Sequence, residues 1–116
     1  MNKKCDCFPL FGEVVEEVRL KMPEESKLEL VVSFFKTLGD NTRMRIICAL
    51  KEKEMCAGDI AVLLDMTKTA VSHQLAIMRQ MRLIKPRRVG KNVFYSLDDK
   101  HVIDIIEKVF THIDHV

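Results

Sequence analysis

The sequence lacks a run of apolar residues near the length that a membrane-spanning helix needs. Lys3 and Lys4 are followed by Cys-Asp-Cys, and no apolar signal segment comes after them. Internal repeats and low-complexity tracts are also missing. The 116 residues are 47% hydrophobic, which suits one domain with a packed core and excludes the disordered class. We therefore expect a cytoplasmic protein with no membrane partner.

A second absence concerns charge, because residues 66–97 contain no carboxylate. These 32 residues carry seven cationic side chains, whereas the rest of the chain has 12 cationic and 17 acidic residues. Surfaces that are only solvated usually mix both signs. The segregation predicts an anionic partner, and a nucleic acid is the obvious candidate.

The sequence has only four cysteines. In a reducing compartment, Cys5, Cys7, Cys48 and Cys56 are better interpreted as free thiols or metal ligands than as a disulfide framework. Cys48 lies in an apolar helical segment, where a thiol usually acts as a small hydrophobic residue.

The pattern of apolar residues predicts a mainly α-helical fold with one β-hairpin. Residues 1–10 form a flexible arm with the Cys-x-Cys pair, and residues 11–116 form the domain. Helices are expected over 11–21, 24–38 and 41–50, and the second of them has a stripe that we expect to be buried. That stripe comprises Leu28, Val31, Val32 and Phe35.

Two further helices, 57–64 and 67–81, are separated by only two residues, which is typical of a helix-turn-helix. Thr67 is the expected N-cap of the second helix, whose apolar stripe is Val71, Leu75 and Met78. The opposite face carries Thr69, Ser72, His73 and Ala76. Two strands then follow within 82–97, with Gly90 in the turn and with Phe94 and Leu97 expected to pack inward.

A helix-turn-helix followed by a basic hairpin predicts a winged helix, whose second helix enters the major groove while the hairpin lies along the backbone. Polar side chains of that helix suit base edges or nearby phosphates, and cationic ones supply charge. His73 could equally be an ordinary surface histidine. The predicted DNA-binding residues are Lys68, Thr69, Ser72, His73, Gln74, Arg87, Arg88 and Lys91.

From about residue 30 to the end, the chain resembles the ArsR/SmtB family of bacterial metal-sensing repressors. The resemblance rests on "MCAGDIA", "TKTAVSHQLAIMRQMRLI", "GKNVFYSL" and "DDKH…HIDH". It implies a homodimer that pairs through its first and last helices, represses a metal efflux or sequestration operon, and releases operator DNA when metal binds.

The C-terminal segment contains three of the four histidines. His101 and His112 are eleven residues apart, about 16 Å along a helix, so they cannot share an ion within one chain. Eleven residues are also about three turns, which places His101, His112 and His115 in one stripe beside an apolar face. In an antiparallel dimer, Asp99 and His101 of one chain would meet His112 and His115 of the other. Such a site suits tetrahedral Zn(II), and Co(II) would also fit.

Asp99 is the difficult member of this set. In an ideal helix it would lie about 200° from His101, so it must sit at the helix start, outside regular geometry. An N-cap role without any metal is the alternative for Asp99, and a solvated polar stripe is the alternative for the histidines. Asp-x-His and His-x-x-His at this interval also resemble the C-terminal helix site of the family.

A second candidate metal site combines Cys5, Cys7, Cys56 and Asp59. Some members of the family bind soft metals between N-terminal cysteines and a cysteine that matches Cys56, often with another thiolate where this chain has Gly58. Three thiolates would suit Cd(II) or Pb(II), and Asp59 could complete a Zn(II) site. The alternative is an ordinary arm and a Cys56 buried at a helix start.

We therefore expect a dimeric repressor that Zn(II) or a similar divalent metal releases from operator DNA. A thiol-based redox or soft-metal (Cd/Pb) sensor on the same fold is the alternative, and a metal-buffering protein is a third hypothesis. An enzyme is not expected, because His73 has no nucleophile partner and a zinc with four protein ligands has no open position for a substrate.

Overall fold

The computed structural model describes residues 8–115, and the chain divides into two compact units, Met1–Val32 and Ser33–Val116. Helix α1 spans Gly12–Lys21 in the first unit and has no buried residue. Helix α2 spans Glu25–Leu38, so it begins in the first unit and ends in the second. Cys5, Cys7 and Val116 lie outside the described residues.

Residues 8–115 of this chain do not cover the apolar stripe of α2. Leu28 is 39% exposed and Phe35 is 53% exposed, and only Leu38 of this helix is buried. The prediction that this stripe is buried was therefore wrong for the single chain. The pattern records which face is apolar, but it does not record which molecule covers that face.

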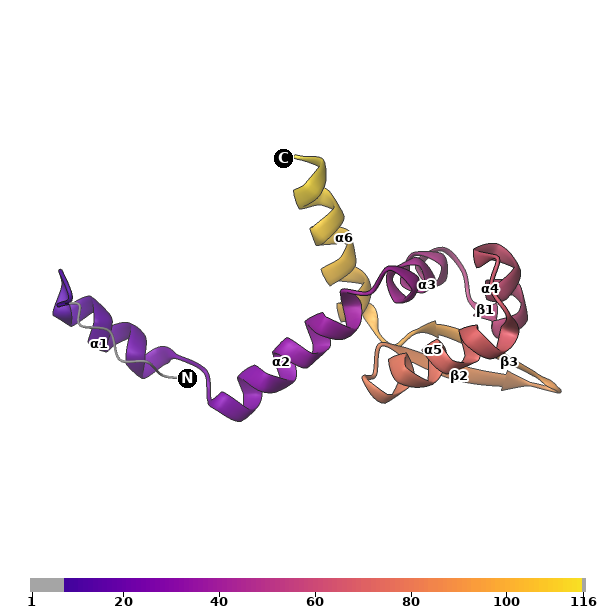
Figure 1. Cartoon of the computed structure of the whole chain (residues 1–116), viewed down its shortest axis with the longest axis horizontal. Coiled ribbons are helices and arrows are strands. Elements are labelled where there is room, and N and C mark those ends of the chain that lie inside the picture. The colour runs from indigo at the N-terminus through magenta and orange to yellow at the C-terminus, as the bar shows by residue number, and fades with distance from the viewer. Residues whose placement is uncertain (1–7, 116) are drawn as a thin grey trace. The chain divides into compact units, whose positions relative to one another are not determined.

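The second unit is a winged helix-turn-helix (Figure 1). The predicted helices and the β-hairpin are confirmed, with small shifts at their ends. After α2 the elements are α3 (Asn41–Glu52), β1 (Met55–Cys56), α4 (Ala57–Leu64), α5 (Lys68–Gln80), β2 (Ile84–Val89), β3 (Asn92–Leu97) and α6 (Lys100–Asp114).

Short-range hydrogen bonds explain where the helices begin and turn. The Asp40 carboxylate accepts a bond of 3.0 Å from the Arg43 N–H and thus caps α3. Asp65 ends α4 in the left-handed conformation, with φ 56°, a region that Asp tolerates better than most residues. Thr67 then caps α5 through the Ala70 N–H at 3.1 Å, as the sequence predicted.

The sheet has three antiparallel strands in the order β1-β3-β2. The hairpin register runs from the pair Ile84↔Leu97 to the pair Val89↔Asn92, and Gly90 takes φ 61° in the turn. Strand β1 was not predicted, because two residues are too short to show an alternating pattern.

Leu97 is buried, but the expectation that Phe94 packs inward with it was wrong. Side chains alternate between the two faces of a strand, so residues three apart lie on opposite faces. Tyr95, two residues before Leu97, is the aromatic side chain that packs against the core. Phe94 lies on the other face, half-buried.

One hydrophobic core holds the second unit together. The predicted stripe of α5 is confirmed as part of it, and the first half of α6 reaches it through Val102 and Ile106. Its members also include Ile46, Ile47, Leu50, Ile60, Leu83, Ile84 and Leu97. Among residues 8–115, no helix combines the length and the apolar character that crossing a membrane requires.

Candidate nucleic-acid interface and metal ligands

Helix α5 presents its polar face to solvent. Burial of Val71, Leu75 and Met78 fixes the rotation of the helix, since these side chains are at most 1% exposed. The face opposite to them is therefore turned outward. Its exposed residues are those predicted for DNA contact, Thr69, Ser72 and His73, together with Ala76.

Gln74, also predicted to contact DNA, lies differently. Its Oε1 accepts a hydrogen bond of 3.1 Å from the Arg43 guanidinium, which also donates to the Thr37 carbonyl at 2.8 Å. Arg43 thereby joins the end of α2 and helix α3 to α5. Sequence reasoning missed Arg43, and no local pattern identifies a contact over 31 residues of separation.

The structure brings three of the predicted DNA-binding residues together. Lys68 and Ser72 of α5 and Lys91 of the hairpin line one cavity of about 260 Å³, with Cys56 and Tyr95 in its wall. Two ammonium groups and a hydroxyl around one opening suit a phosphate oxygen. The predicted cysteine site and the predicted DNA surface therefore meet at Cys56.

Tyr95 was missed by sequence reasoning. It also lines a neighbouring cavity of about 570 Å³, together with Ser72 and His73 of α5. It thus lies on the hairpin, next to the outward face of α5. Strict alternation back from Leu97 would have placed it on the inner face of β3.

The two hairpin arginines lie in different surroundings. Both are exposed, but the Arg87 guanidinium also forms two bonds with the Glu54 carboxylate and lies over the Phe94 ring. Sequence reasoning missed Glu54, which is 33 residues away from its partner.

Asp99 is the N-cap of α6. Its Oδ1 accepts hydrogen bonds from the His101 N–H at 2.8 Å and the Val102 N–H at 3.3 Å. The cap has extended backbone, with φ −152°, and this departure from helical geometry brings Oδ1 within 3.4 Å of His101 Nδ1. Both backbone bonds end on Oδ1, so neither of them uses Oδ2. The same carboxylate can therefore cap the helix and offer an oxygen to a metal ion beside His101.

Several influences set the pKa of Asp99. Desolvation raises it, but the hydrogen bonds from the Val102 and His101 N–H groups and from the His101 side chain lower it more. The net result is a pKa below the usual aspartate value, which keeps the carboxylate ionised.

The three C-terminal histidines are all exposed. His101 lies in the first turn of α6, His112 in the last turn and His115 at the C-cap. Within residues 8–115, no three side chains of His, Cys, Asp or Glu come together closely enough to hold a metal ion. Assembly of the predicted set of Asp99 and three histidines thus requires a second chain.

Cys56 and Asp59 lie at the start of α4. Cys56 is half-buried at the N-cap and makes no side-chain capping bond, and Asp59 is exposed in the first turn. Cys48 and Cys56 are both free thiols, as expected for these two cysteines. The other two proposed ligands, Cys5 and Cys7, fall outside the described residues.

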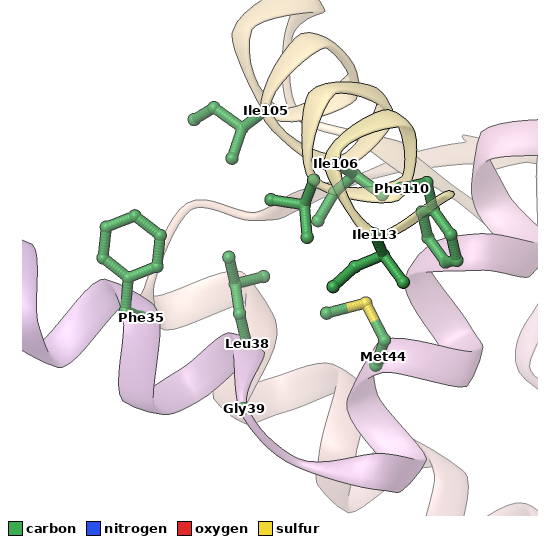
Figure 2. Close-up of a pocket in the computed structure, with 9 residues that line it drawn as sticks. Phe35, Leu38, Gly39, Met44, Ile105, Ile106, Phe110 and Ile113 are labelled. Carbon is green, nitrogen blue, oxygen red and sulfur yellow. The ribbon is translucent and has the colours of Figure 1, made fainter. Parts of the chain in front are cut away.

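An apolar cavity of about 380 Å³ lies between the end of α2, the start of α3 and the second half of α6. Figure 2 shows Phe35, Leu38 and Met44 directed toward Ile106 and Ile113 across it. On α6, Val109 is 48% exposed, Phe110 44% and Ile113 59%. Large apolar side chains grouped at a surface mark a site of association.

Comparison with known proteins agrees with this arrangement. The sequence pattern of the bacterial regulatory proteins of the arsR family matches residues 40–85, from the cap of α3 into β2. A Synechocystis protein described as a transcriptional repressor SmtB homolog is 42% identical over 102 residues, covering 85% of this chain and 77% of that protein. The chain belongs to the ArsR family of bacterial regulatory proteins. A Staphylococcus aureus cadmium resistance transcriptional regulatory protein, a CadC homolog, is 32% identical over 93% of this chain and 89% of its own length.

A solved structure extends the comparison to the fold. The solution structure of apo-NmtR is 30% identical and covers 82% of this chain and 81% of its own, with a TM-score of 0.71. The winged helix-turn-helix of this chain is thus also the fold of apo-NmtR. Members of this family regulate transcription and do not catalyse reactions, which agrees with the expectation of a non-enzyme.

Proposed function

We propose that this ArsR-family regulator is a metal-responsive repressor that binds operator DNA as a homodimer and is released when Zn(II) or a similar divalent metal binds. The observation that carries the proposal is the exposed polar face of α5 beside the cavity that Lys68 and Lys91 line. A duplex in contact with this face would meet hydrogen-bonding side chains for its bases and cations for its phosphates. We place the protein in the cytoplasm, where bacterial operators are.

A second copy of the chain is the proposed cover of the apolar surface on α6. Val109, Phe110 and Ile113 are costly to leave in water, and they continue a face that is already buried at Val102 and Ile106. An antiparallel arrangement of two α6 helices would extend this face across the dimer. It would also set the spacing of the two α5 helices on successive major grooves.

The same pairing supports a metal site between the chains. Asp99 and His101 of one chain would meet His112 and His115 of its partner, giving three imidazoles and one carboxylate. This donor set fits Zn(II) and accepts Co(II). Oδ2 of Asp99, which the capping bonds do not use, is the oxygen we assign to the ion.

Metal releases DNA only if it binds the form of the dimer that cannot bind DNA more tightly than the form that can. The group we assign to this link is the second ring nitrogen of His112, whose N–H would connect the paired α6 helices to the helix-turn-helix. Replacing His112 by Asp keeps a metal ligand and removes that N–H. We expect this variant to bind metal but to stay on DNA, and metal-induced release in the variant would contradict the link.

A cobalt titration of the dimer tests the site. Tetrahedral d–d bands without thiolate charge transfer are expected, and their loss in His101→Ala identifies the α6 set. Strong thiolate charge transfer would instead assign the metal to Cys56 and the N-terminal cysteines. Binding to an operator selected from a random duplex pool, followed with and without Zn(II), tests the regulatory activity. Metal-independent DNA binding would refute it.

A further inference from the structure

The Arg87–Glu54 pair is the most tightly built polar contact on the hairpin surface. Arg87 donates from one NH₂ nitrogen to Glu54 Oε1 at 2.6 Å and from Nε to Oε2 at 2.9 Å. Its guanidinium lies 5.8 Å from the centre of the Phe94 ring. Two parallel bonds and a ring beneath them hold the arginine in one orientation.

The pair links the two edges of the sheet. Glu54 immediately precedes β1, and Arg87 lies in β2, while both of these strands pair only with β3 in the described sheet. Phe94 of β3 is in register with Cys56 on one side and with Arg87 on the other. The arginine therefore reaches across the central strand and fastens the hairpin to the connection after α3.

Strand alternation separates Arg87 from its neighbour Arg88. Ile84, Pro86 and Arg88 share one face of β2, and Ile84 on that face is buried in the core beside α5. Arg87 projects from the opposite face with Phe94. The two arginines thus leave β2 from opposite faces of the sheet, although they are adjacent in the sequence.

We propose that Arg87 is a positioning residue, which Glu54 holds away from the DNA backbone to set the angle of the hairpin. The phosphate contacts of the hairpin then come from Arg88 and Lys91. This inference rests on the proposed binding of operator DNA, and it removes one of the two hairpin arginines from the predicted set of DNA ligands.

The electrostatics of the pair agree with this role. The hydrogen bond from Arg87 lowers the pKa of Glu54 against a smaller opposing effect of desolvation, and the Coulombic attraction of Arg87 lowers it further. The same bond raises the pKa of Arg87. Both groups are therefore ionised at neutral pH, and the Glu54 carboxylate offsets the charge of the Arg87 guanidinium.

The salt dependence of DNA binding tests the proposal, with a labelled mixed-sequence duplex as the probe. The slope of log K against log salt becomes shallower by about 0.9 for each phosphate contact that is lost. Arg88→Gln and Lys91→Gln are expected to show this reduction. Arg87→Gln is expected to weaken binding at every salt concentration with the wild-type slope, and a shallower slope like that of Arg88→Gln would overturn the proposal.

Substitution of Glu54 supplies the matched control. Glu54→Gln should behave like Arg87→Gln, and the double variant should be no weaker than either single variant. The exchanged pair, Glu54→Arg with Arg87→Glu, should recover the affinity of the wild type, which a phosphate ligand could not do. Tighter binding with a steeper slope in Glu54→Gln, or no recovery in the exchanged pair, would overturn the proposal.

A measurement without DNA tests the pairing of Arg87 with Glu54 separately from the proposed binding of operator DNA. NMR titration of the Glu54 carboxyl should give a pKa below the usual range in the wild type and a normal one in Arg87→Gln. A normal value in the wild type would overturn the proposal, because Glu54 would then not be paired with Arg87. If the wild type binds no duplex while the titration is as expected, the failure lies with the proposed function.

Discussion

Helices α5 and α6 both carry an apolar stripe at helical spacing, but this chain covers them to different extents. The stripe of α5 is buried along its whole length by α3, α4 and the sheet. The stripe of α6 is buried only at Val102 and Ile106, and beyond them Val109 and Ile113 are exposed. The apolar stripe of α5 is thus covered by its own chain, whereas that of α6 leaves an exposed apolar surface that suits another molecule.

The largest expected effect is a loss of folding stability when a buried side chain of α5 is truncated. Leu75→Ala removes a side chain that is 1% exposed, and we expect the free energy of unfolding to fall by about 2–5 kcal/mol. Urea unfolding at a fixed protein concentration measures this loss. A loss below about 1 kcal/mol would mean that the site collapses around the alanine.

On α6, a substitution in the apolar stripe should instead weaken dimerisation. Ile113→Asp places a charge on the exposed half of the stripe, and we expect the dimer dissociation constant to rise roughly tenfold or more. Sedimentation over a concentration series measures it. Thr111→Asp, an exposed position of the same helix outside the cavity lining, is the control and should leave dimerisation unchanged. Equal effects of the two variants would contradict the assigned surface.

A smaller effect concerns the cap of α5. Thr67→Ala removes the acceptor of the Ala70 N–H, and a loss of about 1 kcal/mol in unfolding free energy is expected. Thr69→Ala, two residues later and exposed, makes no capping bond and serves as the matched control. A loss of stability in Thr67→Ala that is absent from Thr69→Ala reports the cap.

The smallest expected effect is a difference in pH dependence between the Asp99 cap of α6 and the Thr67 cap of α5. Asp99 has a lowered pKa, so its stabilisation of α6 is present above the usual aspartate pKa and is lost as the pH falls through the folded value. The hydroxyl of Thr67 does not titrate in this range. Amide exchange should therefore show acid loosening of the first turn of α6 but not of α5, and Asp99→Asn should abolish this pH dependence.

The sequence predicted the elements well because their signals are local. The Thr67 cap, the stripe of α5 and the turn at Gly90 each depend on residues within a few positions of one another. What it missed depends on long-range contacts. The bond between Arg43 and Gln74, the pair of Arg87 with Glu54 and the strand at Met55–Cys56 all join residues more than thirty positions apart.

The candidate sites divide in the same way. Exposure of Thr69, Ser72 and His73 follows from helical periodicity, and the structure agrees with it. The position of Asp99 at the helix start, outside regular geometry, was predicted as well, and the extended cap places its carboxylate beside His101. The two metal sites stay predictions, because one requires a second chain and the other includes Cys5 and Cys7.

The bond from Arg43 to Gln74 bears on how much sequence the operator must specify. With Gln74 held by the protein, the one long uncharged polar side chain in the first half of α5 is withdrawn from base reading. Thr69, Ser72 and His73 remain, and such short groups discriminate few base pairs on each half-site. We therefore expect an operator of low information content, whose recognition depends on half-site spacing and on DNA shape more than on a long consensus.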